Sequence, residues 1–293
     1  MKLKREEVIA ACRSSLLPCI HIRPAAGEKP GPADCKFGGD FYLPAGAVPP
    51  EMEFLAQINF TQVPRLEGFP DKGLLQFFLC TEDEKFEAFY EDGCAWKQDA
   101  GFFQVRWYPE VPEDAPACEN AVPDKRWQLD SPEGSMTFES TEEIATISIG
   151  EDGGFAIDLG YESLSDVLTP IFQAAWEEDD EPDDDEDEDE DMEEDGKEEE
   201  EGVYDLENSC EDTDRFAFDF GNWGFKLGGH PALRQGEFRL DEENYQAYSA
   251  LLFQYDLTDA PELERDTFSF FIRPEDLKAR RFDDILMTYH NCF

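Results

Sequence analysis

The chain has 293 residues, 40% of them hydrophobic, which is enough to bury a large core as one domain or two fused halves. Its formal net charge is −47, which argues against binding to a nucleic-acid backbone, because phosphate contacts need clustered Lys and Arg. No apolar run is long enough to span a bilayer, and no apolar segment follows the basic N-terminal residues. We therefore expect no membrane contact, no secretory signal and a cytoplasmic location.

Hydrophobic periodicity predicts short strands and a few helices. The clearest strand lies at residues 52–60, where apolar side chains alternate onto one face. In chain order, we predict a helix at 5–17 that ends before Pro18, a Pro- and Gly-rich loop at 24–32, strands at 52–60, 74–80, 102–108, 144–149 and 155–159, a helix at 161–176, and strands at 216–220, 251–257 and 268–273, the last followed by a helix that begins at Pro274.

An acidic run interrupts this pattern. Residues 177–201 contain 21 acidic residues and one lysine, a net charge of −20, which leaves −27 for the rest of the chain. Like charges at this density repel one another and cannot bury enough apolar surface to order the segment. We predict that residues 177–202 form a disordered insertion, and that the folded part is acidic as well.

One block of sequence occurs twice, at residues 36–85 and again at residues 226–278, and each copy opens with Lys-x-Gly-Gly. Residues 54–67 align without gaps with residues 251–264, with six identical pairs. Chance similarity between two amphipathic strands is the alternative. Because three blocks recur in the same order, we infer two related halves with antiparallel strands.

The eight cysteines include no Cys-x-x-Cys pair, so the usual zinc spacing is absent. Several lie within apolar strand patterns. We expect free thiols that pack as small hydrophobic side chains in a reducing compartment, and we predict no cofactor and no metal.

The best local candidate for a site is the second glycine motif with its continuation, Gly228, Gly229, His230 and Pro231. Paired glycines allow a positive φ or a close backbone approach, and proline stiffens the exit from the turn. An imidazole placed on such a loop is useful for acid–base chemistry. The alternative is a structural turn around a histidine whose hydrogen bonds are satisfied.

Gln57 and Gln254 occupy matching places in the two copies. They could line a cleft between the halves, or each amide could pair with nearby backbone. Nucleophilic catalysis is poorly supported, because the chain has three histidines, no Gly-x-Ser-x-Gly elbow and no phosphate-binding loop.

The glycine motifs, the stretches at 55–60 and 73–78, and the strand around Phe270 and Phe271 together resemble those of the YwqG-like proteins, a bacterial family of unknown function. The resemblance covers nearly the whole chain except the acidic insertion. It implies a cytoplasmic α+β protein with a duplicated, sheet-rich core, and it supplies no catalytic residues. Some relatives occur beside polymorphic toxin systems, which suggests an immunity-like role by analogy.

The chain departs from that family's pattern in two places. Family members often follow the second glycine motif with Gln-x-Asp-Pro-Arg, where this chain has Gln-Gly-Glu-Phe-Arg at residues 235–239. They usually carry a proline two residues after the first glycine motif, where this chain has Phe41.

Together these observations predict an α+β fold, in which residues 1–293 form one sheet-rich domain of two internally duplicated halves. The leading interpretation is a non-enzymatic binding protein that engages a basic protein partner. The alternative is an enzyme with a cleft around His230, Gln57 and Gln254.

Overall fold

The computed structural model describes residues 2–25, 27, 29–81, 95–112, 114–119, 134–149, 155–177, 203–205, 210–233, 236–240, 242–257 and 266–290. Parts of the sequence prediction lie outside these residues. They are the acidic insertion predicted at residues 177–202, apart from its first residue, the end of the first repeat at residues 82–85, and residues 234–235, 241 and 258–265 of the second repeat.

Strands make up most of the regular structure. In chain order they are β1 (Lys2–Lys4), β2 (Leu17–Ala25), β3 (Lys36–Phe37), β4 (Phe41–Tyr42), β5 (Glu53–Asn59), β6 (Leu74–Leu79), β7 (Ala95–Lys97), β8 (Phe103–Tyr108), β9 (Ala117–Cys118), β10 (Gly134–Glu143), β11 (Ile147–Ile149), β12 (Phe155–Ile157), β13 (Val203–Asp205), β14 (Phe225–Gly228), β15 (Ala250–Asp256), β16 (Thr267–Ile272) and β17 (Leu286–His290). The α-helices are α1 (Arg5–Ala11), α3 (Leu164–Glu177), α4 (Cys210–Phe220) and α5 (Pro274–Ala279), and the 3-10 helices are η1 (Arg13–Ser15), η2 (Gln98–Ala100) and η3 (Phe238–Leu240).

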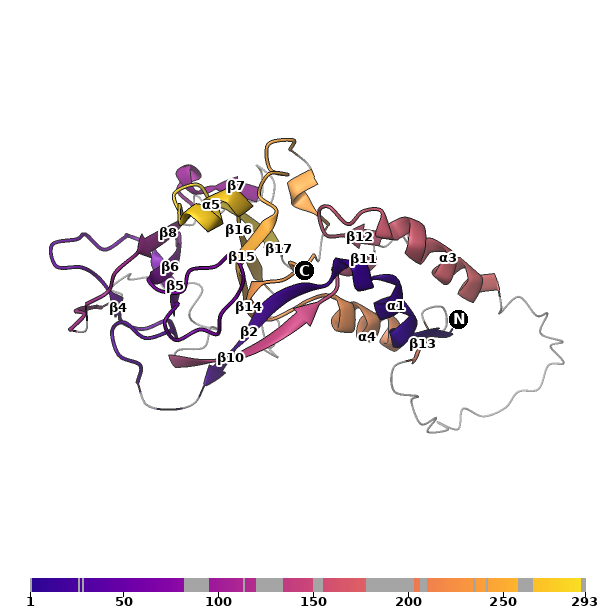
Figure 1. Cartoon of the computed structure of the whole chain (residues 1–293), viewed down its shortest axis with the longest axis horizontal. Helices are drawn as coiled ribbons and strands as arrows, with labels where there is room; N and C mark the ends of the chain where they lie inside the picture. Colours follow the sequence, from indigo (N-terminus) through magenta and orange to yellow (C-terminus); the bar gives the residue numbers. More distant parts are fainter. Residues whose placement is uncertain are drawn as a thin grey trace.

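One large sheet organises the described part of the chain. Its eleven strands follow the order β7-β17-β16-β15-β14-β2-β10-β3-β5-β6-β8, and the pairs between neighbours are antiparallel. The long pair β2–β10 runs through the centre of the molecule (Figure 1). In the sheet order it divides the other strands into two arms, one of β14, β15, β16, β17 and β7 and one of β3, β5, β6 and β8. The sheet-rich, antiparallel character predicted from the sequence is therefore confirmed.

The sheet curls so that its two arms face each other. The ring of Phe77 on β6 lies 4.5 Å from the ring of Phe253 on β15 and 5.0 Å from that of Phe270 on β16, measured between centroids. Five strands separate β6 from β15 in the sheet order, so only a curled sheet brings these rings together. Such aromatic pairs contribute about 0.5–1.5 kcal/mol each beyond the area that they bury. The main core lies between the arms.

A second, smaller core lies beside one end of the central pair. It contains Val8 of α1, Leu168 of α3 and Phe216 of α4, together with residues of β11, β12 and β13. In Figure 1 these helices gather around the end of β10, on the same side as the N-terminus. This helical region and the curled sheet meet where β10 ends.

The two arms repeat the same polar contact. Lys36 pairs in register with Gln57, and Lys226 pairs with Gln254. The Gln57 amide oxygen accepts a hydrogen bond from the backbone of Tyr42 at 3.0 Å, and the Gln254 oxygen accepts one from Ala232 at 2.8 Å. Tyr42 and Ala232 each lie six positions after the lysine of their own copy.

The donor side of each amide repeats as well. The Gln57 amide nitrogen donates to the carbonyls of Pro32 and Asp34, at 2.9 and 2.8 Å. The Gln254 nitrogen donates to those of Asn222 and Gly224, both at 3.0 Å. In both copies these carbonyls precede the lysine by four and two positions. Each arm also carries a bulge just before its glutamine, between residues 54 and 56 and between residues 251 and 253.

Most predicted elements are present. Strands β5, β6, β8, β15 and β16 lie where they were predicted, α3 covers most of 161–176, and α5 begins at Pro274. Two predictions were wrong. Residues 216–220 form the end of α4 rather than a strand, and the predicted helix at 5–17 ends at Ala11, after which η1 leads into β2 at Leu17. Strand β2 also extends to Ala25, into the region predicted as a loop.

The lysine of the first glycine motif is a buried cation that binds backbone carbonyl groups. Lys36 is 2% exposed, and its ammonium donates to the carbonyls of Gly31, Pro32 at 3.3 Å and Asp40 at 3.2 Å. Burial lowers the pKa of Lys36 to about 8, although Asp34 and Asp40 act in the opposite direction.

This lowered pKa predicts a rise in stability at alkaline pH. Between about pH 8 and 10.5 the unfolded chain binds the Lys36 proton more tightly than the folded chain does, so the free energy of unfolding should rise with pH, by up to about 3 kcal/mol. Urea unfolding across this range should show a shallower pH slope for Lys36→Met than for the wild type. The exposed Lys72 is the control, and Lys72→Met should leave the slope unchanged. Parallel curves for wild type and Lys36→Met would contradict this assignment.

Candidate functional site

The second glycine motif forms a turn that only glycine can make here. Gly228 and Gly229 have φ values of +66° and +71°, a region that other residues avoid. A Cβ atom on Gly229 would lie 2.3 Å from Oε2 of Glu143 and 2.7 Å from Cβ of Cys19. The turn therefore lets the Glu143 carboxylate lie directly against the backbone, where the His230 amide donates to Oε2 at 3.2 Å.

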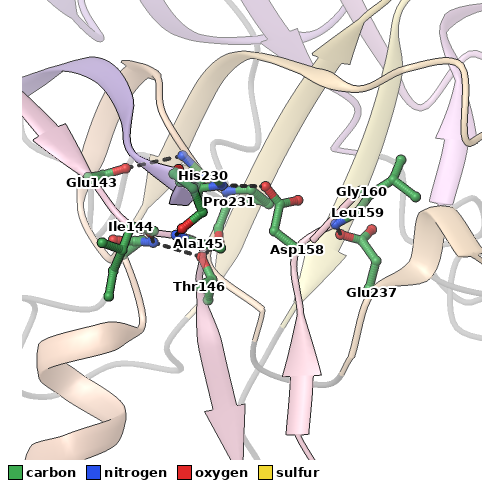
Figure 2. A network of polar contacts seen from close by, with 12 residues as sticks. Glu143, Ile144, Ala145, Thr146, Asp158, Leu159, Gly160, His230, Pro231 and Glu237 are labelled. Carbon is green, nitrogen blue, oxygen red and sulfur yellow. Dashed lines mark hydrogen bonds and ion pairs between the residues drawn. The ribbon is translucent and has the colours of Figure 1, made fainter. Parts of the chain in front are cut away.

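His230 is fully buried between two acceptors. Its Nδ1 lies 2.5 Å from Oδ2 of Asp158, and its Nε2 lies 2.7 Å from the carbonyl oxygen of Ser15. Figure 2 shows the ring between Asp158 and Glu143. Both ring nitrogens are thus occupied by structural contacts, and the ring offers no open position for a substrate. The following residue, Pro231, is also buried, and its carbonyl accepts a hydrogen bond from the hydroxyl of Thr146.

Asp158 belongs to a buried set of four polar side chains, with His230, Glu237 and Arg239. Arg239 is 1% exposed and donates from Nε to Glu237 at 2.8 Å and from Nη2 to both carboxylates. Burial alone would raise the pKa of Asp158, but Arg239 and His230 outweigh it and lower that pKa. Glu237 and Arg239 lie in the stretch 235–239, and no pattern in the sequence marked them as site residues.

A second buried carboxylate, Glu143 at the end of β10, gathers side-chain donors from two other strands, β2 and β14. Lys226 donates to its two oxygens at 3.0 and 2.9 Å, and Nε2 of His21 lies 2.8 Å from Oε1. Burial alone would raise the pKa of Glu143, but Lys226 and His21 lower it to about 2. Cys19 lies beside this carboxylate, and burial, followed by Glu143, raises the pKa of its thiol. We call Cys19, His21, Glu143 and Lys226 the Glu143 cluster.

Strand register explains why these four side chains meet. Cys19 and His21 are two positions apart on β2 and so face the same side of the sheet. On one neighbouring strand, β14, Lys226 pairs with His21 and Gly228 pairs with Cys19. On the other neighbour, β10, Glu143 pairs with Leu17, which has the same facing as Cys19 and His21. The cluster was missed from the sequence because β2 itself was not predicted.

The cluster forms part of the wall of an open groove of about 380 Å³, lined by residues of α1, β2, β10 and α4 and of the loop that precedes β14. We call it the α4 groove and define it by Leu16, His21, Glu142, Glu143, Phe218, Asp219 and Trp223. It combines apolar side chains with carboxylates.

Another cavity, of about 460 Å³, lies at the first glycine motif and is lined by Lys29, Lys36 and Asp40 among others. The first Lys-x-Gly-Gly motif thus lines this cavity itself, whereas the second motif reaches the α4 groove only through the contacts of Glu143.

The structure places Gln57 in one arm and Gln254 in the other, and Gln254 binds the backbone of Ala232, two residues after His230. Gln57 and Gln254 are fully buried in opposite arms, and their amides bind backbone groups. His230 lies at the turn after β14, enclosed by its partners. None of the three lines the α4 groove, the cavity at the first glycine motif or the open pocket beside Arg65 and Arg280. Within the part of the chain that the structure describes, Cys19, His21 and Glu143 form a set that could hold a metal ion.

The chain matches the family described as a domain of unknown function, DUF1963, over residues 35–292, and it therefore belongs to this family. No curated protein matches the chain. The matched region includes both glycine motifs and Glu143, and it begins after β2, so Cys19 and His21 precede it. Among the described residues, no helix has the length and apolar character needed to cross a membrane.

The Gly229 turn can be tested against a glycine of similar backbone. Gly46 has a φ of +82° and open space where a Cβ would lie. Gly46→Ala should cost about 1 kcal/mol of stability from backbone strain alone. Gly229→Ala should cost about 2–5 kcal/mol, because its methyl group also displaces Glu143. Chemical denaturation measures the free energy of unfolding of both variants. Equal decreases would show that the close approach to Glu143 adds nothing to the cost of replacing Gly229.

The buried ion pair of Glu143 has an exposed counterpart on the same strand. Glu143→Gln leaves Lys226 buried without its charge partner and should cost about 3–5 kcal/mol. Glu139 pairs with Arg23 in solvent at 3.0 Å, so Glu139→Gln should cost less than about 1 kcal/mol.

A double-mutant cycle with Lys226→Met isolates the coupling between the paired charges. The loss in the double variant should be smaller than the sum of the two single losses. Strict additivity would mean that the contact between Glu143 and Lys226 does not stabilise the fold.

Proposed function

We propose that this protein is a non-enzymatic binding protein that engages a basic protein partner through the α4 groove. The observation that carries the proposal is the composition of that groove, where solvent-exposed apolar side chains lie among carboxylates. Phe218 is 59% exposed and Leu16 is 36% exposed, and both are in the groove wall. Glu142 and Asp219 lie beside them.

Such a surface is complementary to lysine and arginine side chains. Their aliphatic stems pack on apolar groups while the charged head stays near carboxylates and water. Phe218 and Leu16 supply the apolar contact, and Glu142 supplies an exposed negative charge. Asp219 is already engaged, since Tyr204 donates to it and Arg5 lies 3.7 Å away. A basic segment would therefore place its apolar part against Phe218 and its charge toward Glu142.

The charge of the whole chain supports the same partner class. Outside residues 177–201 the net charge is −27, so the rest of the chain also attracts cations over the distance that salt allows, about 8 Å at physiological ionic strength. Association with a basic partner would be steered by this field. An immunity-like role, in which the partner is a basic toxin, is one form of this proposal, and a cytoplasmic location fits the free thiols of the described cysteines.

The enzyme alternative has less support. An imidazole acting in catalysis needs a ring nitrogen within reach of the substrate. Both nitrogens of His230 are held by Asp158 and Ser15 inside the protein. The amides of Gln57 and Gln254 stabilise loop backbone in the two arms, which is the kind of role that internal duplication of a structural unit would preserve.

A lysine-rich peptide with interspersed leucines tests the groove directly. It should bind the protein, and the same peptide with acetylated lysines should not, because acetylation removes the charge. Phe218→Ser should weaken binding by about tenfold, equivalent to 1.4 kcal/mol. Val48 is 77% exposed and is not part of the groove, so Val48→Ser should leave the dissociation constant unchanged.

Stopped-flow measurement should also show an association rate that falls steeply as salt rises toward physiological concentration. An unchanged dissociation constant in Phe218→Ser would show that the peptide binds outside the α4 groove. An association rate that does not depend on salt concentration would rule out electrostatic steering.

A further inference from the structure

Three side chains of the Glu143 cluster carry atoms that ligate metals, and they converge. Sγ of Cys19, Nε2 of His21 and a carboxylate oxygen of Glu143 all lie within 4.8 Å of one another. The thiol of Cys19 and the carboxylate of Glu143 are buried, while the side chain of His21 is 30% exposed. A thiolate, an imidazole and a carboxylate form a mixed donor set of the kind that zinc accepts.

The positions of these donors are fixed by rigid backbone rather than by loops. Cys19 and His21 lie within the nine-residue pairing of β2 with β10, and Glu143 ends that pairing. The missing side chain of Gly229 leaves room for the carboxylate, since a Cβ there would lie 2.3 Å from Oε2. Donors held on paired strands keep their geometry before an ion arrives, which lowers the cost of binding it.

We propose that Cys19, His21 and Glu143 bind a zinc ion, with the fourth coordination position open to the α4 groove. Two of the three donors, His21 and Glu143, line that groove, which gives the ion an entry path. Three protein ligands with one open position distinguish this arrangement from closed structural zinc sites. The fourth ligand would be water or a donor atom of the molecule that occupies the groove. The site does not rest on the proposed partner.

The proton and charge balance of binding can be written from the hydrogen bonds. In the absence of metal, the Nε2 atom of His21 lies 2.8 Å from Oε1 of Glu143, and a neutral ring donates from Nε2 to that carboxylate. When zinc binds, Cys19 releases its thiol proton to solvent, and His21 moves its proton from Nε2 to Nδ1. The thiolate and the carboxylate then face the two positive charges of zinc and the one of Lys226, so the cluster carries a net charge of +1.

Lys226 would act on the metal through Glu143. Its ammonium lies 3.0 and 2.9 Å from the two oxygens of Glu143 and donates to the carbonyl of Asn222 at 2.7 Å. Partners that hold a ligand in place in this way usually contribute tenfold to a hundredfold in metal affinity. Because Lys226 is itself cationic, it also opposes a second cation nearby, so it orients the carboxylate at some cost in charge repulsion.

Cobalt(II) is the probe that separates this site from carboxylates elsewhere, because a cobalt–thiolate bond produces a charge-transfer band in the near ultraviolet. Titration of the full chain under reducing conditions should produce this band at one equivalent of cobalt, with visible bands typical of four-coordinate cobalt. Zinc should then displace cobalt and bleach both. The experiment uses no partner, so its outcome is independent of the peptide-binding test.

Variants assign the band to its ligands. Cys19→Ser should abolish it, and His21→Gln should lower cobalt affinity by at least about a hundredfold, since losing a ligand costs more than losing a partner that only orients one. His21 is partly exposed, so its replacement tests the site even if Cys19→Ser folds poorly. Cys118 is a half-exposed free thiol on β9, and Cys118→Ser should leave the band unchanged. Absence of the band in the wild type, a band that survives in Cys19→Ser, or unchanged affinity in His21→Gln would each overturn the proposal.

Discussion

The pairing of β2 with β10 is the constraint on which the rest of the structure depends. Nine consecutive residue pairs, from Leu17–Glu143 to Ala25–Ser135, join these strands at the centre of the sheet. Strand β14 adds to the free side of β2, and β3 adds to β10, so each arm grows from one member of the pair. The same pairing brings Glu143 beside Cys19 and His21. One strand register thus positions the two arms, the main core and the Glu143 cluster. A shift of this register by one residue would move the buried side chains to the opposite face of the sheet.

The repeated glutamine contact shows how each arm stays rigid without a long strand at its start. Strand β3 has only two residues and pairs with β5 through Lys36 and Phe37. Gln57 binds backbone groups on both sides of β3, and Gln254 does the same on both sides of the four-residue strand β14, which supplies hydrogen bonds that a longer ladder would otherwise provide. This requirement explains why the same amide recurs at matching positions, and it needs no ligand.

Much of the sheet could be predicted from the sequence, because β5, β6 and β16 show clear hydrophobic patterns and their turn residues mark the ends. The segment 216–220 shows where such a pattern is ambiguous. Its apolar residues alternate, as in a strand, yet Phe216 and Phe220 are also one helical turn apart. The structure buries these two and leaves Phe218 59% exposed, which only a helix allows. Strand β2 was missed because Pro18 was taken as the end of a helix, whereas it is the second residue of a strand.

The candidate site could be predicted only in part, for a different physical reason. The glycine turn is local, and its need for Gly228 and Gly229 follows from neighbouring residues. Its charged partners are distant in sequence: Glu143 meets Lys226 across 83 residues and His21 across 122. No single-chain pattern encodes such pairs, since their positions follow from the order of strands in the sheet.

These long-range pairs also join surface to interior. Glu143 borders the α4 groove, contacts the backbone of His230, and through that residue leads to Asp158 beside the helical core. Glu143 cannot move without leaving the buried Lys226 without its charge partner, which is costly, whereas Arg239 pairs with Glu237 as well as with Asp158. A ligand that binds at the groove wall and shifts Glu143 must break these contacts. Ligands that leave Glu143 in place, or that offer Lys226 a charge in its stead, are therefore strongly favoured.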